Sequence, residues 1–285
     1  MLRPYFFTSC APTVFPLFTS CAPTVFPLVS PSVIEAIGRR SISAIESVGR
    51  VGHFVMDTAR ALPDVGTWAR LLMLQMRRIG VDSLPVALFI AAFTGVVLAL
   101  QASYTFTGAV PLYFVGTLVG KTMMLELGPV LTGLALAGRV GASMAAELGT
   151  MKVTEQVDAL ETLAYDPQSY LVVPRVLAAT LMFPVIVAFS IAVGIITGWL
   201  TSLALLDLST PDFIKGLKLF YLFKDVWFGL LKSASFGFTI ALVGCVVGLG
   251  TRGGAEGVGR STTRTVVYSA ILILVLDAFW AVVLL

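Results

Sequence analysis

Five long apolar stretches, separated by shorter polar segments, dominate this chain after residue 80. A helix of about 20 apolar residues crosses the hydrocarbon core of a bilayer, because it rises about 1.5 Å per residue. The pattern therefore predicts an all-α integral membrane protein with five transmembrane helices. The predicted spans cover residues 83–106, 112–137, 176–206, 223–250 and 265–285.

The stretch 126–175 is the internal region richest in polar residues, and it lies between the second and third predicted spans. Its sequence predicts a Gly-Pro break at 128–129, a turn of small residues at 137–143 and a charged helix over 145–165, which ends before Pro167. Apolar residues recur at helical spacing on that last helix, as Val153, Val157, Leu160 and Ala164. An amphipathic helix between two spans favours a docking element over a solvated connector.

The chain before the first span divides into two segments. Residues 1–31 contain FTSCAPTVFPL twice in tandem, and the proline content predicts a disordered N-terminal extension. Residues 32–80 alternate arginines with apolar residues, which predicts two interfacial helices separated at Pro63. Residues 81–285 form the predicted five-span domain.

Arginine and lysine predict the orientation of the chain. They concentrate in the N-terminal segment and in the loops 139–175 and 252–264, which places these parts in the cytoplasm. Trp199, Trp227 and Trp280 fall at the opposite ends of their spans, as an outer aromatic belt requires. The predicted topology has the N-terminus inside and the C-terminus outside.

Four charges lie within predicted spans: Lys121, Glu126, Lys232 and Asp277. A charge at the bilayer centre costs about 2.5–3.5 kcal/mol, so it usually faces a partner or a cavity. Lys121 and Glu126 are five residues apart and point to different sides of one helix. Lys232 and Asp277 lie at similar depth below the outer face, so we expect them to pair. The alternative for both lysines is snorkelling to the surface.

Other motifs carry less chemistry. VGKT at Val119–Thr122 lacks the first glycine of a phosphate-binding loop, and GLGTRG at Gly248–Gly253 follows a membrane helix rather than a strand. A single histidine predicts no metal site, and three cysteines without paired spacing predict no disulfide framework. We therefore expect no catalytic residues, no cofactor and no nucleic-acid binding. Three GxxxG pairs are consistent with packing inside one subunit or with dimerisation.

The sequence resembles the MlaE/YrbE family of ABC-transporter permeases from about residue 34 to the C-terminus. The motifs that carry the resemblance are ELGP at Glu126–Pro129, AGRVG at Ala137–Gly141, AELGTM at Ala146–Met151, TEQVDAL at Thr154–Leu160, DP at Asp166–Pro167, PR at Pro174–Arg175, KS at Lys232–Ser233, GRSTTRTV at Gly259–Val266 and the late Asp277.

This resemblance implies a homodimeric permease of a phospholipid transporter in the bacterial inner membrane. It also implies a cytoplasmic ABC ATPase, a periplasmic MCE-domain protein and often a small STAS-domain protein as partners. The helix over 145–165 would be the coupling helix seated on the ATPase. The expected coupling residues are Arg139, Glu147, Glu155, Gln156, Asp158 and Leu160.

A lipid route must be mostly apolar with few polar anchors. The first two spans offer an apolar wall for such a route, and we expect Leu100, Tyr104, Tyr113 and Glu126 to line the lipid-binding pocket. One alternative is an ion-coupled secondary transporter with Glu126 and Asp277 as proton carriers, which internal inverted repeats would favour. Another is a membrane scaffold, which would leave the four buried charges unexplained.

Overall fold

The computed structural model describes residues 46, 49–106, 111–206 and 208–284. The chain divides into the units Met1–Ser47 and Val48–Leu285, and the second unit holds all of the elements discussed below. The predicted N-terminal extension lies outside the described residues.

All regular structure in the described part of the chain is helical, which confirms the predicted fold class. A helical segment at 49–61 is followed by a turn at Leu62 and Pro63, as predicted. The longer helices are α2 (Val65–Gly80), α3 (Leu84–Thr105), α4 (Phe114–Thr122), α5 (Gly128–Leu136), α6 (Ala142–Val153), α7 (Gln156–Thr162), α8 (Val173–Leu205), α9 (Thr210–Leu219), α10 (Phe223–Leu249) and α11 (Gly254–Leu284).

Five helical stretches are long and apolar enough to cross a membrane, in agreement with the sequence. Several of them are longer than predicted: α2 and α3 form one stretch, Val65–Thr105, and the second stretch runs from Phe114 to Val153. The predicted loop at 252–264 is also mostly helical, because α11 begins at Gly254. Charged helical turns therefore extend three of the spans at one end.

The predicted Gly-Pro break and the turn at 137–143 do not interrupt the second stretch. π-Helical turns at Met123–Leu127 and Ala137–Gly141 link α4, α5 and α6 into a continuous helix. The small residues at 137–143 do not end this helix. They allow α10 and α11 to pack closely on α6. The predicted helix over 145–165 is instead two helices, α6 and α7, because Glu155 adopts a left-handed conformation with φ of 59°.

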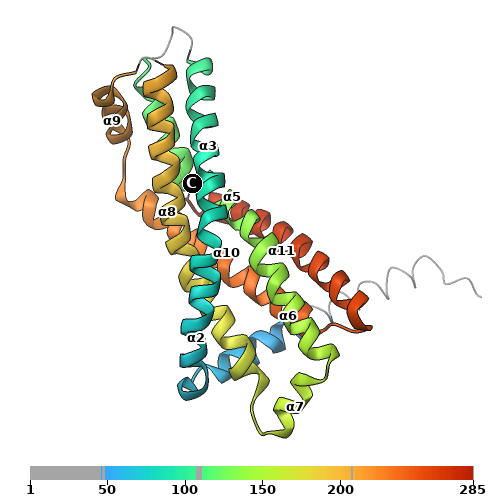
Figure 1. Ribbon diagram of the computed structural model, residues 1–285. Coiled ribbons are helices and arrows are strands. Elements are labelled where there is room, and N and C mark those ends of the chain that lie inside the picture. Colours follow the sequence, from blue (N-terminus) through green and yellow to red (C-terminus); the bar gives the residue numbers. More distant parts are fainter. Residues whose placement is uncertain (1–45, 47–48, 107–110, 207, 285) are drawn as a thin grey trace, which may run out of the picture. The chain divides into compact units, whose positions relative to one another are not determined.

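Helix α8 packs along α2, α3 and α10, and α10 in turn contacts α6 and α11. The short helix α9, which the sequence analysis missed, packs on α4 at the opposite end of α8 from α7 (Figure 1). All three GxxxG pairs pack internally: Gly116 and Gly120 against α9, Gly194 and Gly198 against α3 and α4 and the adjoining Met123, and Gly244 and Gly248 against α6.

Candidate functional site

Lys232 on α10 lies between two carboxylates from different helices. Its ammonium is 2.8 Å from Oε2 of Glu126 and also forms an ion pair with Asp277 on α11. The Lys232 side chain is 1% exposed, whereas Glu126 is 41% and Asp277 23% exposed. The predicted pair of Lys232 and Asp277 is therefore confirmed. Glu126 is a third member that the sequence analysis did not place there.

The Gly-Pro motif helps to build this cation site. Pro129 has no N–H, so the carbonyl of Leu125 cannot receive the usual helical hydrogen bond from the residue four positions later. The π-helical turn before it closes through the N–H of Gly128, which donates to the carbonyl of Met123. The ammonium of Lys232 donates to the free carbonyl of Leu125 at 3.3 Å. Proline thus supplies a backbone acceptor to the ionic cluster rather than breaking the helix.

A second ion pair lies between the same two stretches, nearer to α9. Lys121 on α4 approaches Oδ2 of Asp225 on α10 at 3.6 Å. Asp225 is nearly buried, and Lys121 remains 40% exposed at its side chain. The four predicted membrane charges therefore all have partners of opposite sign in the described structure, and Asp225 is a partner that sequence reasoning missed because it sits at the start of α10.

An apolar groove of about 480 Å³ runs along one side of α3. Phe89, Phe93 and Val97 of α3 form one wall, and Leu127 and Leu131 form the other. Its polar residues are Thr94 and Gln101. Leu127 directly follows Glu126, so the ionic cluster and the groove share the same turn of helix. The groove can receive a long apolar molecule along α3, although Glu126 itself is not one of its lining residues.

Two of the predicted lining residues lie on α3 beside this groove. Leu100 is 40% and Tyr104 84% exposed, and they continue the exposed face that begins with Phe89, Phe93 and Val97. Tyr113 contacts α9 instead, because the ammonium of Lys215 lies 5.1 Å from the centre of its ring.

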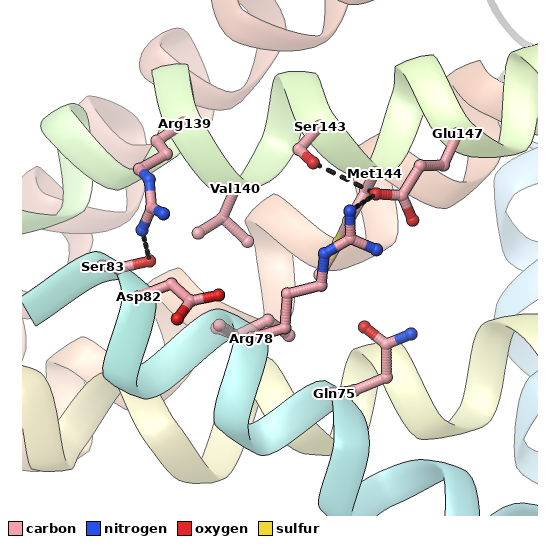
Figure 2. Close-up of a pocket in the computed structure, with 10 residues that line it drawn as sticks. Gln75, Arg78, Asp82, Ser83, Arg139, Val140, Ser143, Met144 and Glu147 are labelled. Atoms are coloured by element: carbon pink, nitrogen blue, oxygen red, sulfur yellow. Dashed lines mark hydrogen bonds and ion pairs between the residues drawn. The ribbon is translucent and has the colours of Figure 1, made fainter.

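A polar pocket of about 260 Å³ lies between α2 and α6 (Figure 2). Arg78 of α2 forms an ion pair with Glu147 of α6, whose other oxygen is 3.5 Å from buried Arg175 on α8. Arg139 donates to the hydroxyl oxygen of Ser83 at 2.6 Å. Asp82 lies between these two arginines in Figure 2, and no ion pair or hydrogen bond of its side chain is found among the described residues.

The six expected coupling residues occupy two places. Arg139 and Glu147 line the polar pocket, whereas the other four lie on or beside α7. The apolar stripe of this segment faces its own chain: Val157 is 5% exposed within the core, and Leu160 packs against it. Val157 and Leu160 are therefore occupied by contacts within the chain, whereas Ala164 of the same stripe is exposed.

What α7 exposes is polar. The exposed residues of this region include Glu155, Gln156 and Asp158, together with Leu163 and Tyr165 at its end. Lys152 bridges the break between α6 and α7 through an ion pair with Asp158 at 2.6 Å. The segment ends at Asp166, whose carboxylate accepts from the N–H and hydroxyl of Ser169 at the start of the next helix.

Comparisons with known proteins agree with these features. A family model described as "Permease MlaE" matches residues 72–283. A probable ABC transporter permease protein of Rickettsia typhi is 45% identical over 205 residues, which cover 72% of this chain and 79% of that protein. A probable ABC transporter permease protein of Synechocystis is 42% identical over 205 residues, covering 72% and 78%.

A more distant relative comes from a plant. The Arabidopsis thaliana protein TRIGALACTOSYLDIACYLGLYCEROL 1, chloroplastic, is 36% identical over 210 residues, which cover 74% of this chain and 60% of that protein. The family match covers the five candidate membrane helices except for residues 65–71, and it includes Glu126, Lys232 and Asp277. This chain therefore belongs to the MlaE permease family, as a multi-pass membrane permease.

Proposed function

We propose that this permease forms the membrane pathway of an ATP-driven transporter for a glycerophospholipid. The observation that carries the lipid assignment is the apolar groove along α3, which offers few polar groups over its whole length. A hydrophilic solute would need a path lined with hydrogen-bonding groups. The plant relative supports the same class, since its name refers to a galactosylated diacylglycerol.

The lipid pocket includes Leu100, Tyr104 and Glu126 and lies where two copies of the chain meet. The exposed apolar face of α3 supports this placement, because a second copy of the chain that covered this face would enclose the lipid. Lys232 and Asp277 hold Glu126 at the wall of the pocket. The charged cluster then binds the polar head group of a lipid at one position of an otherwise apolar path.

A separate ABC ATPase drives the cycle by docking on α7. The acidic residues Glu155, Asp158 and Glu161 support this, because their side chains are exposed on α7 and at its start. Further partners are an MCE-domain protein at the α9 end and a small STAS-domain protein beside the ATPase. In a bacterial inner membrane the α7 end faces the cytoplasm, since the arginine-rich segments lie there.

The ion-coupled alternative is less consistent with the geometry. Glu126 and Asp277 share Lys232 as counter-ion in one ionic cluster, so release of either carboxylate would leave the buried ammonium with one partner fewer. A proton carrier must instead alternate between charged and neutral forms during each cycle. The cluster therefore suits a fixed electrostatic anchor better than a proton relay.

Photo-crosslinking tests the pocket. A photoreactive residue is placed at Leu100, Tyr104 or Leu125, with Phe189 on the exposed face of α8 as the control position. We expect stronger labelling by phospholipid at the three pocket positions than at Phe189. Equal labelling at all four positions would mean contact with bulk bilayer only and would refute the pocket.

Charge reversal tests the docking surface. Glu155→Arg is expected to leave expression intact and to lose the co-purifying ATPase or its response to lipid. Asp64→Arg is the matched control, because Asp64 is an exposed acid before α2 that makes no capping hydrogen bond. Retention of a lipid-responsive ATPase by Glu155→Arg would assign the docking to another surface.

A further inference from the structure

The polar pocket and the apolar groove share the same two walls. On the first helical stretch, Gln75, Arg78 and Asp82 line the pocket, and Phe89 and Phe93 line the groove further along. These positions are three, four or seven residues apart, so they lie on one face of the helix. The second stretch shows the same order, from Glu147 and Arg139 in the pocket to Leu131 and Leu127 in the groove.

Little side-chain volume separates the polar pocket from the apolar groove. Gly138 is exposed, and a Cβ atom added there would meet nothing within 4 Å. Val86, which is three and seven residues before Phe89 and Phe93 and so lies on the same face of α3, is 42% exposed. Helices α3 and α5 touch, whereas α2 and α6 are joined chiefly by the side chains of the pocket. The pocket and the groove therefore follow each other along the same two helical stretches, and together they are called the crevice, which is polar at the α7 end and apolar toward α9.

The lining of the polar section carries charges of both signs, and Arg175 behind it shares Glu147 with Arg78. Arg78 and Arg139 contribute two guanidinium groups, and Asp82 and Glu147 contribute two carboxylates. Arg139 has one hydrogen bond, to Ser83, and no other partner in the described structure. Its remaining N–H groups can bind a phosphate oxygen in a bidentate manner. Asp82 is available for an ammonium group next to that phosphate.

We propose that this crevice holds one glycerophospholipid with a zwitterionic ammonium head group in the polar pocket and its acyl chains in the apolar groove. Arg139 and Arg78 bind the phosphate, and Asp82 accepts hydrogen bonds from the ammonium. The groove from Phe89 to Gln101 is about 18 Å long at 1.5 Å per residue. This length accommodates the acyl chains of one leaflet, whose hydrocarbon layer is about 15 Å thick.

This head-group site rests on the proposed lipid transport and adds a second position to it. It lies at the α7 end, about 20 Å along the helix from Glu126, because 13 residues separate Glu126 from Arg139 at 1.5 Å per residue. The crevice therefore gives a lipid from the leaflet at the α7 end a bound state before or after it occupies the pocket at Glu126.

The test uses the full-length permease in nanodiscs that contain phosphatidylethanolamine with a radiolabelled head group. A photoreactive residue replaces Gln75, which faces the pocket, or Met73, which is 70% exposed on another side of α2. We expect the Gln75 position to trap severalfold more phosphatidylethanolamine than the Met73 position. Diacylglycerol, which lacks the head group and carries its radiolabel in an acyl chain instead, should label both positions equally.

Single substitutions separate the contributions of individual residues to lipid binding. Arg139→Gln should lower the labelling at position 75 about tenfold, because it removes charge-assisted hydrogen bonds. Arg77→Gln is the matched control, since Arg77 is exposed on α2 outside the pocket. Asp82→Asn should abolish the preference for phosphatidylethanolamine over phosphatidylglycerol. Gly138→Phe should block the crevice and lower the labelling, whereas Gly138→Ala should not.

Equal labelling at positions 75 and 73, or labelling that Arg139→Gln leaves unchanged, would overturn the head-group site. An unchanged unfolding temperature of Arg139→Gln shows that its loss of labelling is not a loss of fold. Lipid-stimulated ATP hydrolysis by the complex reports on the proposed function separately. A complex that hydrolyses ATP in response to lipid but fails the labelling test refutes the head-group site alone.

Discussion

Lys232 carries a charge at 1% side-chain exposure, and its three acceptors come from two neighbouring stretches. Glu126 and the carbonyl of Leu125 belong to the second stretch, and Asp277 belongs to α11. The lysine is therefore the common member of the cluster. Loss of the lysine leaves two carboxylates close together without a cation, whereas loss of one carboxylate leaves the lysine with the other.

This geometry predicts an asymmetry between single substitutions. Lys232→Met should lower the free energy of unfolding by about 3–5 kcal/mol, the usual cost of leaving buried charges unpaired. Asp277→Asn should cost about 1–3 kcal/mol, because Glu126 still neutralises the lysine. Chemical unfolding of the purified protein in detergent measures both values.

The double variant Lys232→Met/Asp277→Leu completes the cycle. It should be more stable than Lys232→Met alone, since only the partly exposed Glu126 then lacks a cation. Strictly additive losses would mean that the two residues do not interact in the folded protein.

The sequence was sufficient to predict the pair of Lys232 and Asp277, because depth along two apolar helices can be counted from residue numbers. It was not sufficient to place Glu126 against Lys232. That contact depends on the π-helical turn at Met123–Leu127, which rotates the residues after Thr122 relative to a regular helix. No spacing rule for α-helices detects such a turn.

At the scale of elements, α7 is bounded by two residues with positive φ that are not glycine. Glu155 has φ of 59° and Ala164 has φ of 60°. Ala164 completes a tight C-terminal cap, in which the N–H of Tyr165 donates to the carbonyl of Leu160 and the N–H of Ala164 donates to that of Glu161. This position favours glycine, because a Cβ atom is strained in the left-handed region.

We therefore expect Ala164→Gly to stabilise α7 by about 1 kcal/mol, which is the strain removed less the flexibility added. Amide hydrogen exchange of this segment should slow about fivefold. Ala159→Gly is the control, because Ala159 is exposed inside the same helix and its replacement should cost about 1 kcal/mol. Faster exchange in Ala164→Gly would show that backbone strain at the cap does not limit the stability of α7.

Close packing of α3 on α8 depends on glycine from both helices. A Cβ atom at Gly95 would overlap the carbonyl oxygen of Gly194, and Gly198 lies close to the carbonyl of Gly95. The GxxxG pattern of α8 is thus used inside one subunit, an alternative that the sequence left open. Neither composition nor spacing indicates whether such a face meets its own chain or another.

Gly95→Ala should lower the free energy of unfolding by about 1–3 kcal/mol, because backbone atoms cannot yield to the added methyl group. Gly66→Ala on α2 is the control, since nothing lies within 4 Å of a Cβ atom there and a gain of about 0.5–1 kcal/mol is expected. Thermal unfolding of the two variants in one detergent provides the comparison. Equal stability of Gly95→Ala and the unchanged protein would contradict the close contact.

At the scale of the whole membrane domain, the extra helical turns changed the boundaries but not the number of spans. Gly128 and Pro129 predict a break in a water-soluble helix. In a membrane helix, π-helical turns and neighbouring side chains satisfy the backbone groups that a proline leaves free. The ammonium of Lys232 does so for Leu125. The segment from Phe114 therefore continues as one helix to Val153, and its last turns lead into α7, whose Val157 packs in the core.

The same architecture predicts which surfaces lie on opposite faces of the bilayer. One span, Gln168–Leu205, separates α7 from α9, and its 38 residues exceed the length needed to cross the hydrocarbon core. The arginine-rich segments lie with α7, so we expect α7 in the cytoplasm and α9 outside. Ala159→Cys on α7 and Lys218→Cys on α9 are both exposed positions that test this.

The measurement is the labelling of intact bacterial cells with a membrane-impermeant maleimide. Cys10 and Cys21 are replaced by serine in all variants. Cys245 can remain, because it is fully buried in α10. Lys218→Cys should react in intact cells, and Ala159→Cys should react only after permeabilisation. Reaction of both cysteines from the same side would show that Gln168–Leu205 does not span the membrane. The reversed pattern would keep the span but invert the domain, and an ATPase in the cytoplasm could then not reach α7.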